Sequence, residues 1–253
     1  MKTDKKRIEI LDELRGFAIL AMIVHHTFYD IGFVMGIDWG YKVFDALCNL
    51  QPIFWTLFIV ISGICSQLSR NTIKRGLIVL LGGLVVTVVT AVIMPAMGIV
   101  GAEIYFGILT CLGICMIITG LLRVPIMRIN SKIGMAICAV LFCLTYSIST
   151  GSLLFGIIDL PDALYTTNWL MPFGIFNDNF YSADYFSLIP WIFMFIFGAF
   201  VGRYAKQNQF PQWTYKKRSP ALAFIGKNSL WIYLAHQPVI YAFCFVATLI
   251  INR

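Results

Sequence analysis

The chain has 253 residues, of which 59% are hydrophobic and only 12% are charged. This composition excludes an ordinary water-soluble domain and favours a multi-pass membrane protein. The net charge of +7 does not indicate a nucleic-acid-binding protein, because the basic residues form short clusters between apolar runs.

Seven apolar runs have about the length that a helix needs to cross a bilayer. They predict membrane spans at about 14–36, 51–69, 76–98, 104–122, 131–150, 184–203 and 222–250. We therefore expect an all-α, polytopic helical bundle that forms a single integral-membrane domain over residues 1–253. The last run could begin as a short interfacial turn before it crosses, and Pro238 could kink it.

Basic residues fall at alternate connections between these runs, which is the positive-inside pattern. The clusters lie at residues 1–7, 70–75, 123–132 and 203–218. We therefore expect a cytoplasmic N-terminus, an outer C-terminus and a location in the cell membrane. The long connection 151–183 is expected on the outer side.

The first predicted span contains ionisable residues, which are costly at membrane depth and so indicate a function. It reads RGFAILAMIVHHTFYD and starts at Arg15. Arg15 and His26 lie on one helix face, roughly 16 Å apart, and Asp30 continues that stripe one turn later. His25 lies about 100° around the helix from His26.

The three histidines of the chain, His25, His26 and His236, all fall within predicted spans. Neutral histidines bonded to backbone or hydroxyl groups across helices are one interpretation, and axial haem ligands are another. A general base or acyl carrier is the third. Asp30, four residues after His26, favours acid–base chemistry because a carboxylate can hold an imidazole in one tautomer.

The second span ends with Ser62 and Gly63, which allow close helix packing or approach of a ligand to the backbone. Arg70, Lys74 and Arg75 follow and could bind the phosphates of a ligand. The positive-inside pattern would place cations here without any ligand.

The remaining polar groups lie in the outer connection and the last span. Asp178, Asn179 and Asp184 suit a polar ligand, although a plain ordered loop explains them equally well. Tyr233, His236 and Gln237 lie deeper, where so many polar residues usually line a cavity. Six of the seven cysteines lie inside apolar runs without a metal-binding pattern, so no metal site is expected.

Four phrases carry a resemblance to a known family. They are the Arg15-to-His26 spacing, FIVISG at 58–63, DYFSLIPWIFMFIFGAFVGR at 184–203 and IGKNSLWIYLAHQPV at 225–239. In this order the chain resembles the heparan-α-glucosaminide N-acetyltransferase catalytic-domain family. That family belongs to the broader transmembrane acyltransferase superfamily, which includes the type 3 acyltransferases.

The resemblance implies an acyl-CoA donor, expected to be acetyl-CoA, that is bound from the cytoplasmic side, and an acceptor reached from the outer side. Arg15 and His26 match the superfamily's arginine and essential histidine, and His236 matches its C-terminal histidine. Longer heparan enzymes carry a histidine in the connection after the first span, whereas residues 37–51 here contain none. This favours the general superfamily mechanism.

The sequence therefore predicts a membrane acyltransferase with His26 as general base or transient acyl carrier, Asp30 orienting it, and His236 acting at the acceptor side. Donor binding is assigned to Arg15, Ser62, Gly63, Arg70, Lys74 and Arg75, and acceptor binding to Asp178, Asn179, Asp184 and Gln237. A membrane transporter or small-ligand binding protein is the alternative, and a haem-binding redox protein is a third. An amino sugar, glycan hydroxyl, lipid or small amine remains open as acceptor, and so does a homo-oligomer.

Overall fold

The computed structural model describes residues 7–251, and these residues form two compact units. The first unit contains the residues up to 61 and those from 210 onward, and the second contains residues 62–209. The all-α prediction is confirmed: the described strands are two residues each, and the remaining regular structure is helical. The single domain stays a prediction.

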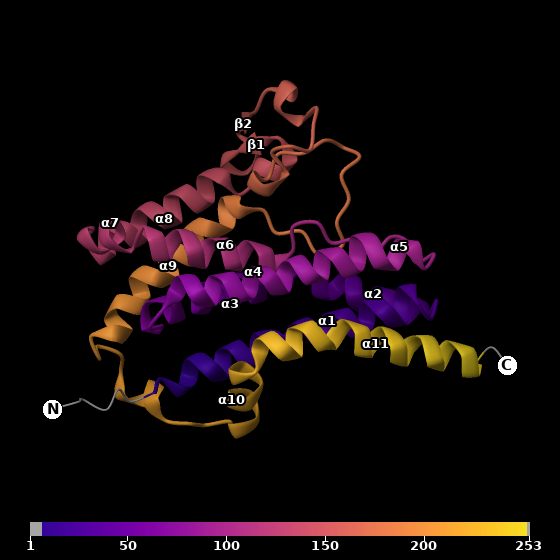
Figure 1. Cartoon of the computed structure of the whole chain (residues 1–253), viewed down its shortest axis with the longest axis horizontal. Coiled ribbons are helices and arrows are strands. Elements are labelled where there is room, and N and C mark those ends of the chain that lie inside the picture. Colours follow the sequence, from indigo (N-terminus) through magenta and orange to yellow (C-terminus); the bar gives the residue numbers. More distant parts are fainter. Residues whose placement is uncertain (1–6, 252–253) are drawn as a thin grey trace. The chain divides into compact units, whose positions relative to one another are not determined.

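The first unit is built around α1. Its elements are α1 (Glu9–Phe33), α2 (Asp38–Cys48), the part of α3 (Gln51–Leu68) up to residue 61, η6 (Gln212–Tyr215), α10 (Pro220–Lys227) and α11 (Ser229–Ile251). Helix α1 packs against α2, α10 and α11 (Figure 1). The first span therefore contacts the C-terminal helices along much of its length.

Glycines allow α1 and α10 to approach closely. A Cβ atom at Gly226 would lie 1.8 Å from the carbonyl oxygen of Asp12, and one at Gly16 would lie 2.1 Å from that of Leu222. Neither position has room for a side chain, so these two glycines set the distance between the helix backbones.

Local capping explains where α10 begins. The Ser219 side chain accepts a hydrogen bond from the backbone N–H of Leu222, and Pro220 is the first helical residue. The helix ends at Lys227, and α11 starts at Ser229. The predicted run 222–250 is thus two helices with a break at Asn228, as the alternative of a short initial turn anticipated, and α11 continues through Pro238.

In the second unit, α4 packs against α6 and α8 packs against α9, and α6 also contacts α9. Its elements are α4 (Thr72–Val88), η1 (Val89–Ile93), α5 (Met94–Ala96), α6 (Ile108–Leu121), α7 (Arg123–Arg128), α8 (Ser131–Thr145), η2 (Ile148–Thr150), β1 (Ser152–Leu153), η3 (Leu154–Gly156), β2 (Ile158–Asp159), η4 (Asp162–Tyr165), η5 (Met171–Phe173) and α9 (Leu188–Lys206). Figure 1 shows β1 and β2 beyond one end of α8.

Six described helices are long and apolar enough to cross a membrane. They are Glu9–Phe33, Gln51–Leu68, Thr72–Ala96, Ser131–Thr150, Leu188–Lys206 and Ser229–Ile250. The fourth predicted span, 104–122, contains α6, which has 14 residues and extends about 21 Å. The hydrocarbon core is about 30 Å thick, so a full crossing by α6 stays a prediction. The orientation of both termini depends on the number of crossings and therefore also stays a prediction.

Two connections contain more structure than the sequence indicated. Residues 37–51 include α2, an 11-residue helix. Residues 151–183 include a two-stranded hairpin and short 3-10 turns. This connection extends to α9, which begins at Leu188 rather than at residue 184.

A tyrosine hydrogen bond holds the end of this connection. The Tyr185 hydroxyl donates to the Met171 carbonyl. Burial raises the pKa of Tyr185, so the donor keeps its proton.

Candidate active site

His26 and His236 meet where α1 packs against α11. Their ring centroids are 5.2 Å apart with an interplanar angle of 54°. The prediction placed His26 on one stripe of α1 with Arg15 and Asp30, and the structure turns this stripe toward the C-terminal helices. Arg15 contacts α10, while His26 and Asp30 contact α11.

The tautomer of His236 is fixed by its own helix. Its Nδ1 lies within hydrogen-bond distance of the Tyr233 carbonyl oxygen. Because a carbonyl can only accept, Nδ1 must carry the proton and Nε2 must carry the lone pair. Nε2 is buried and has no hydrogen-bond partner within the described part of the chain. His236 is therefore an imidazole held ready to accept a hydrogen bond or a proton.

Asp30 and Gln237 form the second contact between these two helices. The Gln237 amide nitrogen lies 3.2 and 3.3 Å from the two carboxylate oxygens of Asp30, which is 1% exposed. The amide donates from its NH₂ group to Asp30, so its Oε1 is directed elsewhere. Gln237 Oε1 is buried and unpaired among residues 7–251. Asp30 thus bonds Gln237, and its role in orienting His26 stays a prediction.

His236 Nε2 and Gln237 Oε1 are hereafter called the two unpaired atoms. Both are hydrogen-bond acceptors, they belong to adjacent residues, and their side chains contact the His26–Asp30 stripe of α1. A buried acceptor without a donor is costly. The site therefore suits a ligand group that supplies hydrogens.

His25 faces a different set of partners. Its ring nitrogens lie 3.0 and 2.6 Å from the Gln51 amide nitrogen, and Nε2 lies 3.6 Å from the Cys48 sulfur. Its ring is also 4.6 Å from that of Phe44. The expected 100° separation thus gives the two neighbouring histidines different partners, although their own ring centroids lie 5.7 Å apart.

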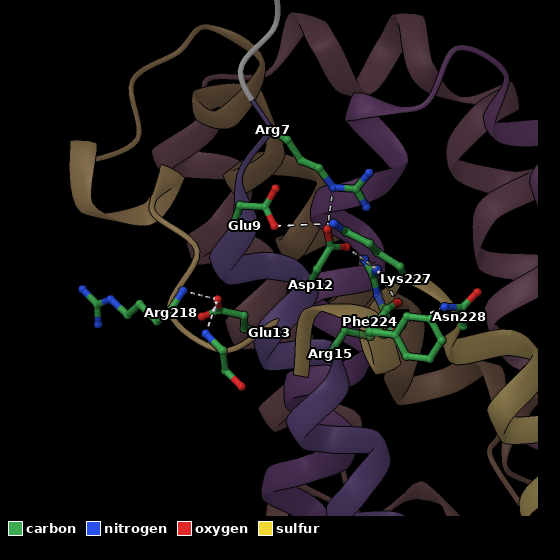
Figure 2. A network of polar contacts seen from close by, with 11 residues as sticks. Arg7, Glu9, Asp12, Glu13, Arg15, Arg218, Phe224, Lys227 and Asn228 are labelled. Atoms are coloured by element: carbon green, nitrogen blue, oxygen red, sulfur yellow. Dashed lines mark hydrogen bonds and ion pairs between the residues drawn. The ribbon is translucent and has the colours of Figure 1, made fainter. Parts of the chain in front are cut away.

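Arg15 lies in a polar network near the start of α1 (Figure 2). Its Nη1 donates to Asp12 Oδ1 and to the Gly226 carbonyl, each at 3.2 Å, and its side chain is 11% exposed. These bonds link α1 to α10. Donor binding by Arg15 stays a prediction.

Acidic residues complete that network, and the sequence interpretation did not assign them. Glu13 Oε1 accepts from the backbone N–H groups of Arg218 and Ser219, at 2.6 and 2.9 Å. Asp12 pairs with Arg7 at 2.7 Å, and Glu9 lies 3.6 Å from Lys227 Nζ. Figure 2 shows Glu13 directed at the segment that precedes α10. Two sequence features could have indicated this network. Three acids lie in the first two turns of α1, and a basic segment precedes the last predicted span.

The other predicted donor residues lie in the second unit. Ser62 and Gly63 are buried, and a Cβ atom at Gly63 would lie 2.0 Å from the Phe195 carbonyl oxygen, so this glycine serves packing between α3 and α9. Arg70, Lys74 and Arg75 are exposed around the start of α4, where the Asn71 side chain caps the helix. Their predicted convergence with Arg15 stays a prediction.

The predicted acceptor residues of the outer connection also lie in the second unit. Asp178 and Asn179 are exposed, and the backbone N–H of Asn179 donates to Asn177 Oδ1. Asp184 Oδ2 accepts from the backbone N–H of Ile108 at 3.3 Å, at the start of α6. Asp184 therefore has a capping role in the structure, whereas substrate binding by these three residues stays a prediction.

The sequence model of one protein family, described as heparan-alpha-glucosaminide N-acetyltransferase, catalytic, matches residues 7–238. Comparisons with curated proteins and with solved structures gave no match. The family match covers most of the chain and includes both compact units, with His26, Asp30, His236 and Gln237 inside it. The chain therefore belongs to the heparan-α-glucosaminide N-acetyltransferase catalytic-domain family.

Proposed function

We propose that this protein is an integral-membrane acetyltransferase that transfers an acetyl group from acetyl-CoA to a primary amine, such as the amino group of an amino sugar. The family match supports acetyl transfer, and six apolar helices support a multi-pass membrane protein. Placement in the type 3 acyltransferase superfamily is part of the proposal.

The two unpaired atoms are the reason why we propose an amine as the acceptor. A primary amine brings two N–H donors and could satisfy both His236 Nε2 and Gln237 Oε1, whereas a hydroxyl brings one. The carbonyl oxygen of a thioester is itself an acceptor and could pair with neither atom. We therefore assign this part of the site to the amine substrate rather than to the donor.

The chemistry follows from the tautomer of His236. The amine nitrogen attacks the carbonyl carbon of the acetyl thioester, a C–N bond forms and the C–S bond breaks. His236 Nε2 takes the amine proton, and the bond from Nδ1–H to the Tyr233 carbonyl stabilises the resulting imidazolium. That proton then passes to the departing thiolate, which gives free CoA. His26, beside His236, polarises the thioester carbonyl in this direct transfer. In the alternative of a transient carrier, a ring nitrogen of His26 first displaces CoA from the acetyl group, and the amine then attacks the acetyl-imidazole carbonyl and releases His26.

Exposed cations near the start of α4 have the positive charge that the phosphates of CoA would bind. Arg70, Lys74 and Arg75 are exposed and surround the start of α4. We propose that these three residues bind the nucleotide end of the donor from the cytoplasmic side. Scarce water within the membrane would protect the bound thioester from hydrolysis.

Product analysis tests the proposed function. Purified protein in vesicles receives acetyl-CoA with a radiolabelled acetyl group and either glucosamine or glucose, which differ in one amino group. We expect labelled N-acetylglucosamine and little product from glucose. Translocation of intact acetyl-CoA without transfer would support the transporter alternative and reject the enzyme, and equal acetylation of both sugars would reject the amine assignment.

Cysteine labelling tests the proposed sidedness. Single cysteines are placed at positions 160 and 212 in a variant otherwise free of reactive cysteines, and intact cells receive a membrane-impermeant thiol reagent. We expect labelling at 160 and not at 212, since the connection 151–183 is proposed to face outward. The reverse pattern would invert the topology and contradict transfer from an inner donor to an outer acceptor.

A further inference from the structure

A short hairpin in the second unit exposes apolar side chains at its turn. Strands β1 and β2 are antiparallel, with Ser152 opposite Asp159 and Leu153 opposite Ile158. Phe155, Ile157 and Ile158 are 62%, 78% and 46% exposed. Such a surface is unusual on a loop in water, because turns at the tip of a hairpin are normally polar.

The backbone of this turn is constrained. Leu154 and Phe155 have φ angles of 50° and 57°, followed by Gly156 at 94°. Bulky side chains rarely adopt this left-handed region, so the surrounding structure must hold them there. The arrangement projects Phe155 and Ile157 from a tight, ordered turn.

Helix α8 indicates the depth of the hairpin. The Phe155 ring lies 5.4 Å from that of Tyr146, and Tyr146 belongs to the candidate span 131–150. Tyr146 directly follows Thr145, the last residue of α8. The hairpin therefore folds back against the end of α8 shown in Figure 1.

The absence of charge and the adjoining candidate span indicate what covers this turn. Residues 151–158 contain no charged side chain. On α8 the exposed residues Ile133, Ile137 and Val140 recur at helical spacing and form an apolar surface that lipid covers in a membrane protein. Tyr146, which contacts Phe155, is 39% exposed. Aromatic side chains at this position are typical of the membrane–water interface.

We propose that the hairpin turn, residues 154–158, is inserted into the interfacial region of the bilayer beside the end of α8. Its occupant is lipid, with Phe155 and Ile157 at the level of the headgroup and upper acyl region. The hairpin thereby fixes the connection 151–183 to the membrane surface instead of letting it project into water.

Site-specific photocrosslinking tests this proposal with the full chain in vesicles of phosphatidylethanolamine and phosphatidylglycerol. The photoreactive residue p-benzoylphenylalanine replaces Ile157, Val140 on the lipid-facing surface of α8, or the exposed Asp178. After illumination, mass spectrometry of the peptides identifies phospholipid adducts.

We expect an adduct yield at position 157 comparable to that at position 140, and no lipid adduct at position 178. No lipid adduct at 157 while 140 forms one would overturn the proposal. A crosslink from 157 to a second copy of the chain, or equal yields at 157 and 178, would also overturn it. Acetyl transfer does not enter this test, so its result is independent of the proposed function.

Discussion

Two neighbouring histidines on α1 differ in what surrounds them. His25 is bonded to Gln51 and lies beside Cys48 and Phe44, whereas His26 faces His236, whose Nε2 has no partner in the described residues. They are adjacent residues of the same type on one helix. This difference in partners is the reason why we propose chemistry for His26 and packing for His25.

The largest expected effect comes from replacing His26, the histidine that faces His236. His26→Ala should lower the rate of acetyl transfer by about 100- to 10,000-fold, the usual loss for a group acting on the reacting atoms. His25→Ala is the matched control and should stay close to wild type. Steady-state rates of N-acetylglucosamine formation measure both. Equal rates for the two variants would remove the distinction between the two faces of α1.

The glutamines on the two faces allow a second comparison. Gln237→Leu removes the donor to Asp30 and one unpaired atom, so we expect a rate loss of roughly 10- to 100-fold, equivalent to about 1–3 kcal/mol. Gln51→Leu alters only the His25 environment and should change the rate little. Rates and KM for glucosamine are measured for both variants, and a larger loss in Gln51→Leu would contradict the assignment.

The polar face of α1 also depends on close helix contact. Gly226→Ala places a methyl group where the Asp12 carbonyl oxygen lies, and such overpacking should lower stability by about 1–3 kcal/mol. Lys227→Ala removes only a partly exposed ion pair with Glu9 and should cost at most about 1 kcal/mol. Thermal unfolding in detergent compares them, and equal melting temperatures would argue against the glycine contact.

The smallest effect concerns the donor. Arg70→Ala with Arg75→Ala should weaken acetyl-CoA binding by about tenfold, or 1.4 kcal/mol. Arg70→Lys with Arg75→Lys is the control that keeps the positive charge and hence the membrane orientation, and it should lose less. Isothermal titration calorimetry measures both variants. Unchanged affinity in the alanine variant would place the CoA phosphates elsewhere.

Sequence spacing predicted the residues of the candidate site better than their partners. Helical periodicity in an apolar run was enough to place Arg15, His26 and Asp30 on one stripe. It did not show that Asp30 bonds Gln237, because that contact depends on the register between α1 and α11. The Arg15 contact with Gly226 depends in the same way on the close approach of α10.

The fold was predictable where hydrophobicity alone decides and less so elsewhere. Long apolar runs identified six helices with membrane-spanning length. Helix α2 was missed because it is short and lies in a connection, and the break at Asn228 separates two helices within one continuous apolar run. The hairpin at 152–159 was also missed, since its turn uses bulky residues instead of the usual turn residues.

The central claim is that His236 Nε2 takes the proton of the substrate amine. The most direct measurement is the rate of glucosamine acetylation by purified His236→Ala, with and without added imidazole, at a saturating concentration of acetyl-CoA. We predict a loss of about 100- to 10,000-fold, with acetyl-CoA binding retained and activity partly restored by imidazole. A His236→Ala variant that acetylates glucosamine at the wild-type rate would contradict the account.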